Sequence, residues 1–430
     1  MGYKRDFNEI KQQVKYLNER FGFKGLLHFT DFTNLKTIFE QGYLYSRYYC
    51  ENNIKSFVDG ANHEVLNLAD EDVHKAVRFY YRGKSPTLYN NEGIKLKEHC
   101  NQIHLPIPVY LLFDEELIYL DNTKFTNGNA TNSEKGNSAL FFKNMDWDAI
   151  FHQTYVEPEE RSFIVNRRQA ELLSEDPVPL SYLKEIIFRC EADRKRAINL
   201  FGNDSRYKVD LSLFSDKNFN EAHKECEKNN FISDYKIEYV YDINQNKTAL
   251  LLKVKYQKPW KYYNTIFKIM DINGLNITEF RKNITYKTKF GTIIKESIDN
   301  NEIKILKLEG EPLKWFKLEV YVNEILCIEE FLVKDDIESY NIYFVNDKNK
   351  RKLVLNRKFR NHNFTLYSHR YEIFNMHNEL IQGGTINFEQ GNRGLNWNLT
   401  FNNYDESWFK IKYYMDNALC ISDEIKSLPF

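Results

Sequence analysis

The acidic residue whose surroundings most favour chemistry is Glu171, in the middle of residues 167–173. Two arginines, Arg167 and Arg168, precede it, and two apolar residues, Leu172 and Leu173, follow it. Such a carboxylate is expected at the end of a strand, half sheltered from water and facing cations, and side chains in these surroundings are often used in catalysis. An ordinary surface ion pair is the simpler explanation, so the interpretation depends on the groups upstream.

Two upstream segments carry residues that could bind a nucleotide. An apolar strand expected at residues 26–29 would deliver His28 and Thr30 to the start of a helix, where backbone amides suit a phosphate or a ribose hydroxyl. The second segment, residues 77–82, mixes aromatic residues with cations. A flat heterocycle could stack on a tyrosine there while Arg78 or Arg82 faces a phosphate.

The two tyrosines of the second segment, Tyr80 and Tyr81, are neighbours in a predicted strand and must point to opposite faces. One of them is therefore expected in a binding pocket and the other in the core, and the pattern does not distinguish them. A histidine in a strand, such as His28, is by itself more often structural than a ligand.

Length and charge limit the classes of protein that remain. At 430 residues the chain should form two or three domains. Its net charge of −1 gives no overall basic field, so a nucleic acid must be bound by a local patch. No run of about 18 apolar residues occurs and the first ten residues are not apolar, so we expect a cytoplasmic protein without membrane span or signal peptide.

The first region, residues 1–231, is predicted to mix helices and strands. Apolar residues at three- and four-residue steps predict a helix from Phe7 to Phe21, and a second helix should begin near Asp31 or Thr33 and end at Gly42. Further strands are predicted at residues 77–81, 107–113 and 182–190, helices at 191–201 and 219–230, and a loop at 121–140.

From about residue 235 onward, short alternating strands separated by polar turns are typical of β-sandwiches. Residues 315–328 recur 93 residues later as residues 408–421, and each copy should contain a hairpin, with turns at 323–324 and 416–417. We therefore expect two tandem immunoglobulin-like sandwiches, residues 232–334 and 335–430. Cys327 and Cys420 occupy equivalent places and are expected as buried thiols, and no cysteine pair has a metal-binding spacing.

The first region resembles the DarT-type ADP-ribosyltransferases, toxins that modify single-stranded DNA with NAD as co-substrate. The resemblance covers about residues 22–205 and rests on short motifs in the family's order: His28-Phe29-Thr30, residues 42–46 ending in Ser46, residues 77–81, Ser85-Pro86, and Gln169-Ala170-Glu171. It implies an α+β fold, in which an ADP-ribosyltransferase-like split β-sheet with helices precedes the two sandwiches.

The resemblance also implies roles for individual residues. Glu171 would be the catalytic glutamate that stabilises the oxocarbenium-like ribose when nicotinamide leaves. The family's arginine between the first helix and the aromatic strand is missing, and Arg47 is the candidate replacement, with Arg78 or Arg82 as alternatives. NAD would be contacted by His28, Phe29, Thr30, Ser46, Tyr80, Tyr81, Arg78 and Arg82, and the target by a loop with Trp147, Phe151, Tyr155 and Gln169.

Three functions stay open on the sequence. The first is ADP-ribosylation of a nucleobase, in single-stranded DNA, by a toxin or anti-phage effector with a separate antitoxin or trigger protein. The second keeps the transferase but places the acceptor in RNA or protein, because strand binding usually relies on a basic groove. The third is an inactive transferase domain whose sandwiches act as a binding or sensor protein.

Overall fold

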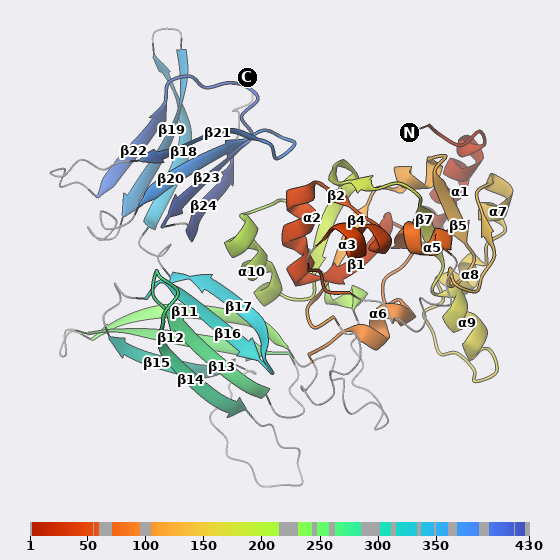
Figure 1. The fold of residues 1–430 in the computed structure, drawn as a ribbon, viewed down its shortest axis with the longest axis horizontal. Coiled ribbons are helices and arrows are strands. Elements are labelled where there is room, and N and C mark those ends of the chain that lie inside the picture. The colour runs from red at the N-terminus through yellow and green to blue at the C-terminus, as the bar shows by residue number, and fades with distance from the viewer. Residues whose placement is uncertain are drawn as a thin grey trace. The chain divides into compact units, whose positions relative to one another are not determined.

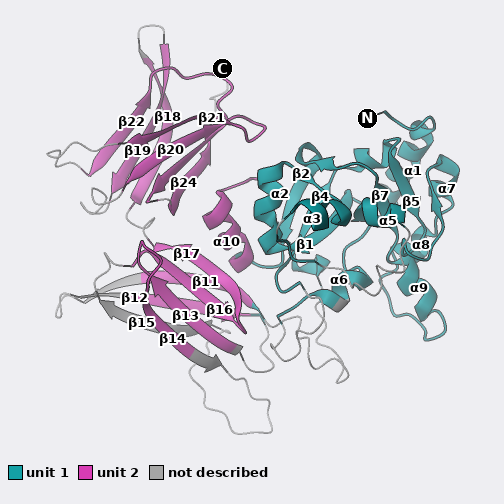
Figure 2. Cartoon of the chain, viewed as in Figure 1, with its two compact units in different colours: residues 1–191, 206–231, 257–260 teal, residues 192–205, 232–256, 261–430 magenta. Residues whose placement is uncertain are grey.

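The computed structural model describes residues 2–54, 56–59, 71–94, 105–214, 231–242, 247–257, 263–284, 302–310, 315–332, 337–347, 350–359, 368–386, 395–416 and 418–425. The helix expected at residues 219–230 lies outside these ranges. The chain divides into two compact units, one of residues 1–191, 206–231 and 257–260 and the other of residues 192–205, 232–256 and 261–430 (Figure 2).

The first unit is built on an eight-stranded sheet with the order β10-β9-β4-β1-β3-β7-β5-β6 (Figure 1). Neighbouring strands are antiparallel except for β9 and β10, which are parallel. The strands are β1 (Leu26–Asp31), β3 (Val77–Tyr80), β4 (Pro108–Phe113), β5 (Thr123–Thr126), β6 (Lys135–Gly136), β7 (Glu171–Ser174), β9 (Leu183–Phe188) and β10 (Tyr207–Val209). A separate pair joins β2 (Tyr43–Leu44) to β8 (Val178–Pro179).

The helices of the first unit are short apart from α1. They are α1 (Phe7–Phe21), α2 (Leu35–Gln41), α3 (Arg47–Asn53), α5 (Glu71–Lys75), α6 (Pro86–Asn91), α7 (Ala139–Lys143), α8 (Trp147–Ile150) and α9 (Arg161–Arg167). The predicted first helix is confirmed in its bounds, and it buries Ile10, Val14 and Leu17. Both α1 and α2 end at glycines, Gly22 and Gly42, in the left-handed conformation that glycine adopts without strain.

Side-chain caps fix where the elements near the site begin. Asp31 ends β1 and accepts a hydrogen bond from the Thr33 amide, so the chain turns into the 3₁₀ helix that precedes α2. Ser46 caps α3 in the same way through the Tyr49 amide. These turns bring the end of β1, the start of α2 and the start of α3 to one side of the sheet.

The register of the central strands places residues from distant parts of the sequence in one row. Leu27 of β1 lies opposite Tyr80 of β3, and Tyr80 lies opposite Glu171 of β7. The loop expected at residues 121–140 differs from the structure, because it contains β5 and β6 and the start of α7. Strand β5 pairs with β7, and β6 pairs with β5. The Asn- and Gly-rich sequence does not predict these short strands, because their pairing depends on tertiary register.

In the second unit, the described strands form two sets of two sheets with the same strand order, which we refer to as the first and the second sandwich. The first sandwich has sheets β11-β12-β15 and β14-β13-β16-β17, and the second has β18-β19-β22 and β21-β20-β23-β24. The strands of the first are Ile232–Asp242, Lys247–Tyr256, Tyr263–Met270, Asn276–Ile284, Glu302–Gly310, Lys317–Val322 and Ile325–Phe331 (β11–β17). Those of the second are Ile337–Asp347, Lys350–Phe359, His369–Phe374, Leu380–Ile386, Asn396–Phe401, Lys410–Met415 and Ala418–Glu424 (β18–β24).

The sequence repeat is the last hairpin of each sandwich, β16–β17 and β23–β24. The expected turn of the first hairpin is present, with Asn323 and Glu324 both at positive φ. In the second sandwich, residues of both sheets share one core that includes Leu355, Ile373 and Trp408. The strand pattern agrees with two sandwiches, and their immunoglobulin-like character stays an expectation.

One helix departs from the linear domain boundary. The predicted helix α10 (Glu191–Phe201) is present, but it packs in the second unit rather than with residues 1–191. Its Arg196 donates to the carbonyl of Leu326 at 2.7 Å, and its Asn199 donates to the carbonyl of Glu329 at 2.8 Å, both in β17. The helix is therefore part of the first sandwich by its contacts, although the sequence places it between β9 and β10.

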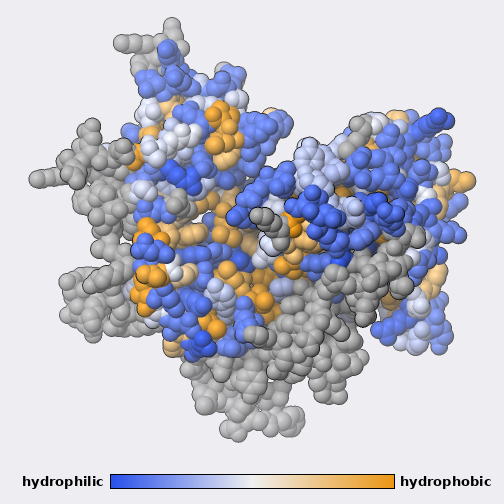
Figure 3. Space-filling view, viewed as in Figure 1, coloured by the Kyte–Doolittle hydropathy of each residue, from blue (hydrophilic) through white to orange (hydrophobic). Residues whose placement is uncertain are grey.

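No helix in the described ranges is long and apolar enough to cross a membrane. In Figure 3, hydrophilic residues predominate on the visible face of the first unit. Within the same ranges, no group of three or more histidine, cysteine or acidic residues could hold a metal ion.

Candidate active site

Glu171 is the first residue of β7 and its side chain is fully buried. The two carboxylate oxygens accept hydrogen bonds from Nε and Nη2 of Arg78 at 2.5 and 2.7 Å, which is a bidentate pair. Burial alone would lower the pKa of Arg78, but the charge of Glu171 outweighs it and raises the pKa above its ordinary value. The carboxylate therefore faces a permanent cation from the neighbouring strand, and not the arginines that precede it in sequence.

A buried threonine holds the backbone of Glu171 in place. Thr126, at the end of β5, accepts a hydrogen bond from the Glu171 amide at 2.9 Å and donates to the carbonyl of Gly128 at 2.7 Å. Its side chain is fully buried. The sequence assigned Thr126 no role of its own, because it lies in the Asn- and Gly-rich segment that we expected to be a loop.

The imidazole of His28 contacts the backbone of the same arginine. Nδ1 of His28 lies 2.9 Å from the carbonyl oxygen of Arg78. A carbonyl can only accept, so Nδ1 carries the proton and Nε2 is left as an acceptor. Burial lowers the pKa of His28 to about 4, so the imidazole is neutral at neutral pH.

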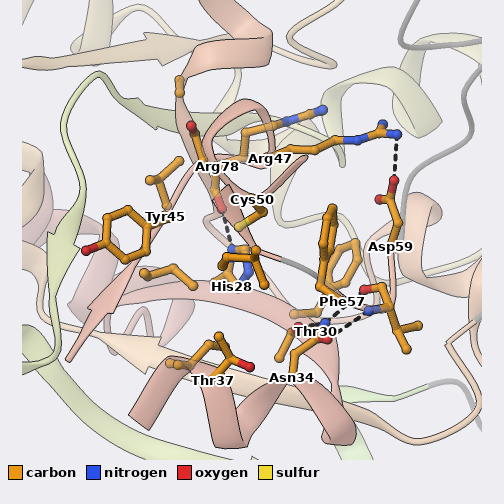
Figure 4. A pocket seen from close by; sticks show the side chains of 18 of the residues that line it. His28, Thr30, Asn34, Thr37, Tyr45, Arg47, Cys50, Phe57, Asp59 and Arg78 are labelled. Carbon is orange, nitrogen blue, oxygen red and sulfur yellow. Dashed lines mark hydrogen bonds and ion pairs between the residues drawn. The ribbon is translucent and has the colours of Figure 1, made fainter. Parts of the chain in front are cut away.

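A pocket of about 180 Å³ lies beside this pair. Figure 4 shows side chains from β1, α2, α3 and β3 that point into it. Seven residues predicted to act at the site line it: His28, Phe29, Thr30, Ser46, Arg47, Arg78 and Tyr80. Glu171 is not in the lining and is joined to the pocket through Arg78.

Asn34 organises the wall of the pocket and was missed by the sequence analysis. Its side-chain amide donates to the Thr30 hydroxyl at 2.9 Å and to the carbonyl of Val58 at 2.8 Å, and its oxygen accepts from the Val58 amide at 2.8 Å (Figure 4). Asn34 thus joins β1 to a segment 24 residues further along. An asparagine beside the start of a helix is common in sequences, so nothing singled it out.

Arg47 lies on another wall of the pocket, between two carboxylates. Its Nε is 2.8 Å from Glu51 and its Nη2 is 2.5 Å from Asp59. Glu51 also lies 3.3 Å from Nε2 of His74, another lining residue. Arg47 therefore lines the pocket with its charge shared between two carboxylates, whereas Arg78 is the cation that contacts Glu171. A contact of Arg47 with NAD stays a prediction.

The structure distinguishes the two tyrosines that the sequence could not. Tyr80 lines the pocket and stacks on Phe29, with ring centroids 5.3 Å apart. Tyr81 is buried on the other side and packs edge-on against Trp147 at 5.1 Å. Burial, followed by the charge of Glu171, raises the pKa of Tyr80 to about 12. Tyr81 is thus a core residue rather than a residue that lines this pocket.

The aromatic residues expected in a target loop are divided between core and surface. Trp147 is buried, and Phe151 stacks on Phe21 with a centroid distance of 4.7 Å. Tyr155 is 76% exposed. Trp147 and Phe151 therefore pack under this segment, because the apolar faces of α1 and α8 need covering. Only Tyr155 of these three is accessible at the surface, and its contact with a target stays a prediction.

Neither Gln169 nor Arg82 lines the pocket, although Thr87, a hydrogen-bond partner of Gln169, does. The Gln169 side-chain oxygen accepts from the Thr87 hydroxyl at 3.1 Å and from Asn129 at 3.0 Å. Arg82, expected to face a phosphate of NAD, is not in the lining and donates to the carbonyls of Ile150 and His152 at 3.1 and 2.7 Å. The chain ends its strand at Tyr80, and this turn directs Arg82 away from the pocket.

Comparison with known proteins identifies a family that the first region matches. Residues 27–217 match the family model described as "ssDNA thymidine ADP-ribosyltransferase, DarT". Similar solved structures include Thermus sp. 2.9 DarT in complex with ADP-ribosylated ssDNA, at 16% identity and a TM-score of 0.37, over 44% of this chain and 95% of that chain. The same Thermus protein in complex with NAD+ gives 16% and 0.34, over 44% and 96%.

Thermosipho africanus DarTG in complex with ADP-ribose is also similar, with 16% identity and a TM-score of 0.36 over 45% of this chain and 51% of that chain. A search of the curated proteins gives no match. The family match confirms the resemblance seen in the sequence and does not extend into the sandwiches. Residues 27–217 therefore form a DarT domain, the domain of a family of NAD-dependent ADP-ribosyltransferases.

Proposed function

We propose that the chain transfers ADP-ribose from NAD to a thymidine base of single-stranded DNA. The observation that carries the proposal is the buried Glu171–Arg78 pair beside a neutral His28, at the wall of a pocket in a DarT domain. The choice of thymidine as acceptor comes from the family description, and the choice of reaction comes from the groups at the pocket. NAD is a substrate here, and no other cofactor is needed.

The lining of the pocket suits one end of NAD. A volume of about 180 Å³ is below the roughly 300–1,000 Å³ of pockets that hold a whole ligand. We therefore assign it to the nicotinamide and its ribose. Tyr80, supported by Phe29, offers a flat surface for the ring, and Nε2 of His28 can accept a hydrogen bond from a ribose hydroxyl.

Glu171 supplies the electrostatic part of the reaction. Loss of neutral nicotinamide leaves positive charge on the ribose, and a carboxylate fixed in a low-dielectric site stabilises this charge. In the structure both carboxylate oxygens are bound by Arg78, so direct contact with the ribose requires the pair to open on the pocket side. Arg78 would then hold one oxygen and orient the other.

The acceptor step must also dispose of a proton. Thymine has one ring nitrogen that carries a hydrogen, and its attack on the ribose forms an N–C bond while the bond to nicotinamide breaks. The nitrogen loses its proton in this step, and the freed oxygen of Glu171 is the group placed to receive it. The products are ADP-ribosylated thymidine, nicotinamide and one proton.

The biological role follows the same family and stays a proposal. We propose a toxin or anti-phage effector in the cytoplasm, restrained by a separate antitoxin or released by a trigger. The two sandwiches would recognise the trigger or bring the enzyme to its target. Sandwich folds serve many functions, so their shape alone does not choose between these roles.

One observation favours a different acceptor. The exposed segment before α9 carries Glu157, Glu159 and Glu160, which repel a phosphate backbone. A protein acceptor is therefore the second candidate, with the same chemistry at Glu171. The two candidates differ only in the substrate that carries the label.

The test is transfer of label from radioactive NAD to separate pools of single-stranded DNA, duplex DNA, RNA and protein. We expect label in single-stranded DNA, and no label there with the Glu171→Gln variant. The Arg281→Gln variant is a matched control, because Arg281 is an exposed residue of the first sandwich. Label in the protein pool alone would replace the first candidate by the second.

A further inference from the structure

Arg82 and Arg168 converge on one backbone carbonyl near Glu171. Arg82 donates from Nη1 to the carbonyl of His152 at 2.7 Å, and Arg168 donates to the same oxygen from Nε and Nη2 at 2.9 and 2.6 Å. Two groups that share one acceptor atom must be neighbours. The structure thus holds two guanidinium cations side by side.

These two cations lack a counter-charge among the residues that the structure describes. Their hydrogen bonds go to the carbonyls of Gly83, Ile150 and His152, which are uncharged. By contrast, Arg78 is paired with a carboxylate. Burial and then the charge of Arg168 lower the pKa of Arg82 to about 10, because the charged form loses water contacts and is repelled by the second cation. This repulsion has an electrostatic cost. An anion between them would remove this cost.

Both guanidinium groups also present unused donors. Within the described ranges, Nη2 of Arg82 and Nη1 of Arg168 bind no other atom, and neither nitrogen is buried. Both residues are partly exposed. Planar forks with open N–H edges match the oxygens of a phosphate in bidentate fashion.

The place of the pair in the fold indicates which phosphate it would bind. Arg168 lies three residues before Glu171, and Arg82 lies two residues after Tyr80, the register partner of Glu171. Neither arginine lines the NAD pocket. A phosphate held here would therefore flank the catalytic carboxylate without belonging to the pocket for NAD.

We propose that Arg82 and Arg168 form an anion site that binds a backbone phosphate of the acceptor strand, next to the nucleotide that is modified. The inference rests on the proposed function, because it takes the acceptor to be a nucleic-acid strand. It also supplies the local basic patch that a chain of net charge −1 needs for such a substrate.

The structural alternative is that the pair only caps the end of α8. The carbonyls of Ile150 and His152 lie at that end, where cations are favoured. A cap would affect folding and the shape of the loop, but it would not exchange salt ions for a phosphate. The salt dependence of strand binding therefore separates the two roles.

The experiment measures binding of a fluorescent thymidine-containing single-stranded oligodeoxynucleotide to the full chain, without NAD, over a series of salt concentrations. For Arg82→Gln and Arg168→Gln we expect binding weakened by about tenfold or more. The slope of log Kd against log salt should fall by roughly 0.7 to 1 for the lost phosphate contact. Arg281→Gln should change neither value, and NAD affinity should be unchanged throughout.

Further arms separate the sources of the anion and the kinds of failure. Arg168→Lys keeps the charge and a donor to His152, so it should recover part of the binding and of the slope. Inorganic phosphate should compete with the oligonucleotide on the wild type. If both Gln variants bind the strand with an unchanged slope, the anion site is refuted while the proposed function stands. If the wild type binds inorganic phosphate but no strand, both the strand-binding role of the two arginines and the proposed function are refuted.

Discussion

Removing Arg78 should cost more stability than removing its partner, because the two side chains differ in burial. The Glu171 side chain is completely buried, whereas that of Arg78 is 23% exposed. Arg78→Gln leaves a buried carboxylate without a cation, which typically costs about 3–5 kcal/mol. Glu171→Gln leaves a cation that water can reach, so about 1–3 kcal/mol is expected.

The double variant tests whether these costs come from the pair itself. With both charges gone, it should be more stable than Arg78→Gln alone, and the coupling energy should be at least about 2 kcal/mol. Global unfolding of a chain with several domains is not two-state. Hydrogen exchange of the amides in β3 and β7 is the suitable measurement, because it reports the opening free energy of this part of the sheet.

Two outcomes would refute this reasoning. Additive single effects, with a coupling energy below about 0.5 kcal/mol, would show that the pair does not exist as described. The activity provides the second check, since both single variants should lose about two to three orders of magnitude in transfer rate. An Arg78→Gln enzyme with full activity would mean that another residue orients Glu171.

Three further predictions concern other groups of the first unit. The pKa of His28 is 6.5 in the unfolded chain and about 4 in the folded chain. As pH falls between these values, His28 is protonated in the unfolded chain but stays neutral in the folded chain, which favours unfolding. The opening free energy of this part of the sheet should therefore fall by up to about 3 kcal/mol over this range relative to His28→Gln, as measured by hydrogen exchange of the β1 amides at each pH. Asn34→Ala should weaken NAD binding about fivefold or more in calorimetry, because Thr30 and Val58 lose their bridge. Lys4→Met should lower the opening free energy of β5 by about 1–3 kcal/mol in hydrogen exchange, because buried Lys4 donates to two backbone carbonyls; unchanged exchange of the β5 amides would contradict this.

Local sequence patterns predicted several features of the elements around the pocket. The strand that carries His28 and Thr30 ends where Asp31 caps the next turn, and such caps are visible in sequence. The alternation of Tyr80 and Tyr81 predicted that one would be core, and the structure shows that it is Tyr81. These features depend on neighbours within a few residues, which periodicity and capping rules describe.

The features that the sequence did not predict all depend on contacts between distant residues. Arg78 and Glu171 are 93 residues apart, and the register of β3 against β7 brings them together. Thr126 reaches the Glu171 amide across 45 residues. Arg82 was expected to face a phosphate because its segment mixes aromatic residues with cations, but β3 ends at Tyr80 and Arg82 binds backbone carbonyls instead. A single chain gives no information on register, so these pairings could not be derived from it.

The position of α10 bears on the third function, in which the sandwiches act alone. In sequence the helix lies between β9 and β10, two neighbouring strands of the transferase sheet. Its buried polar residues, Arg196 and Asn199, are nevertheless hydrogen bonded to the backbone of β17 in the first sandwich. A binding module that acted independently would need only a linker after residue 231. Here, instead, the first sandwich also includes a helix that precedes residue 231 in the sequence and is fixed to β17 by buried hydrogen bonds, so a fragment that begins after residue 231 would lack part of this sandwich.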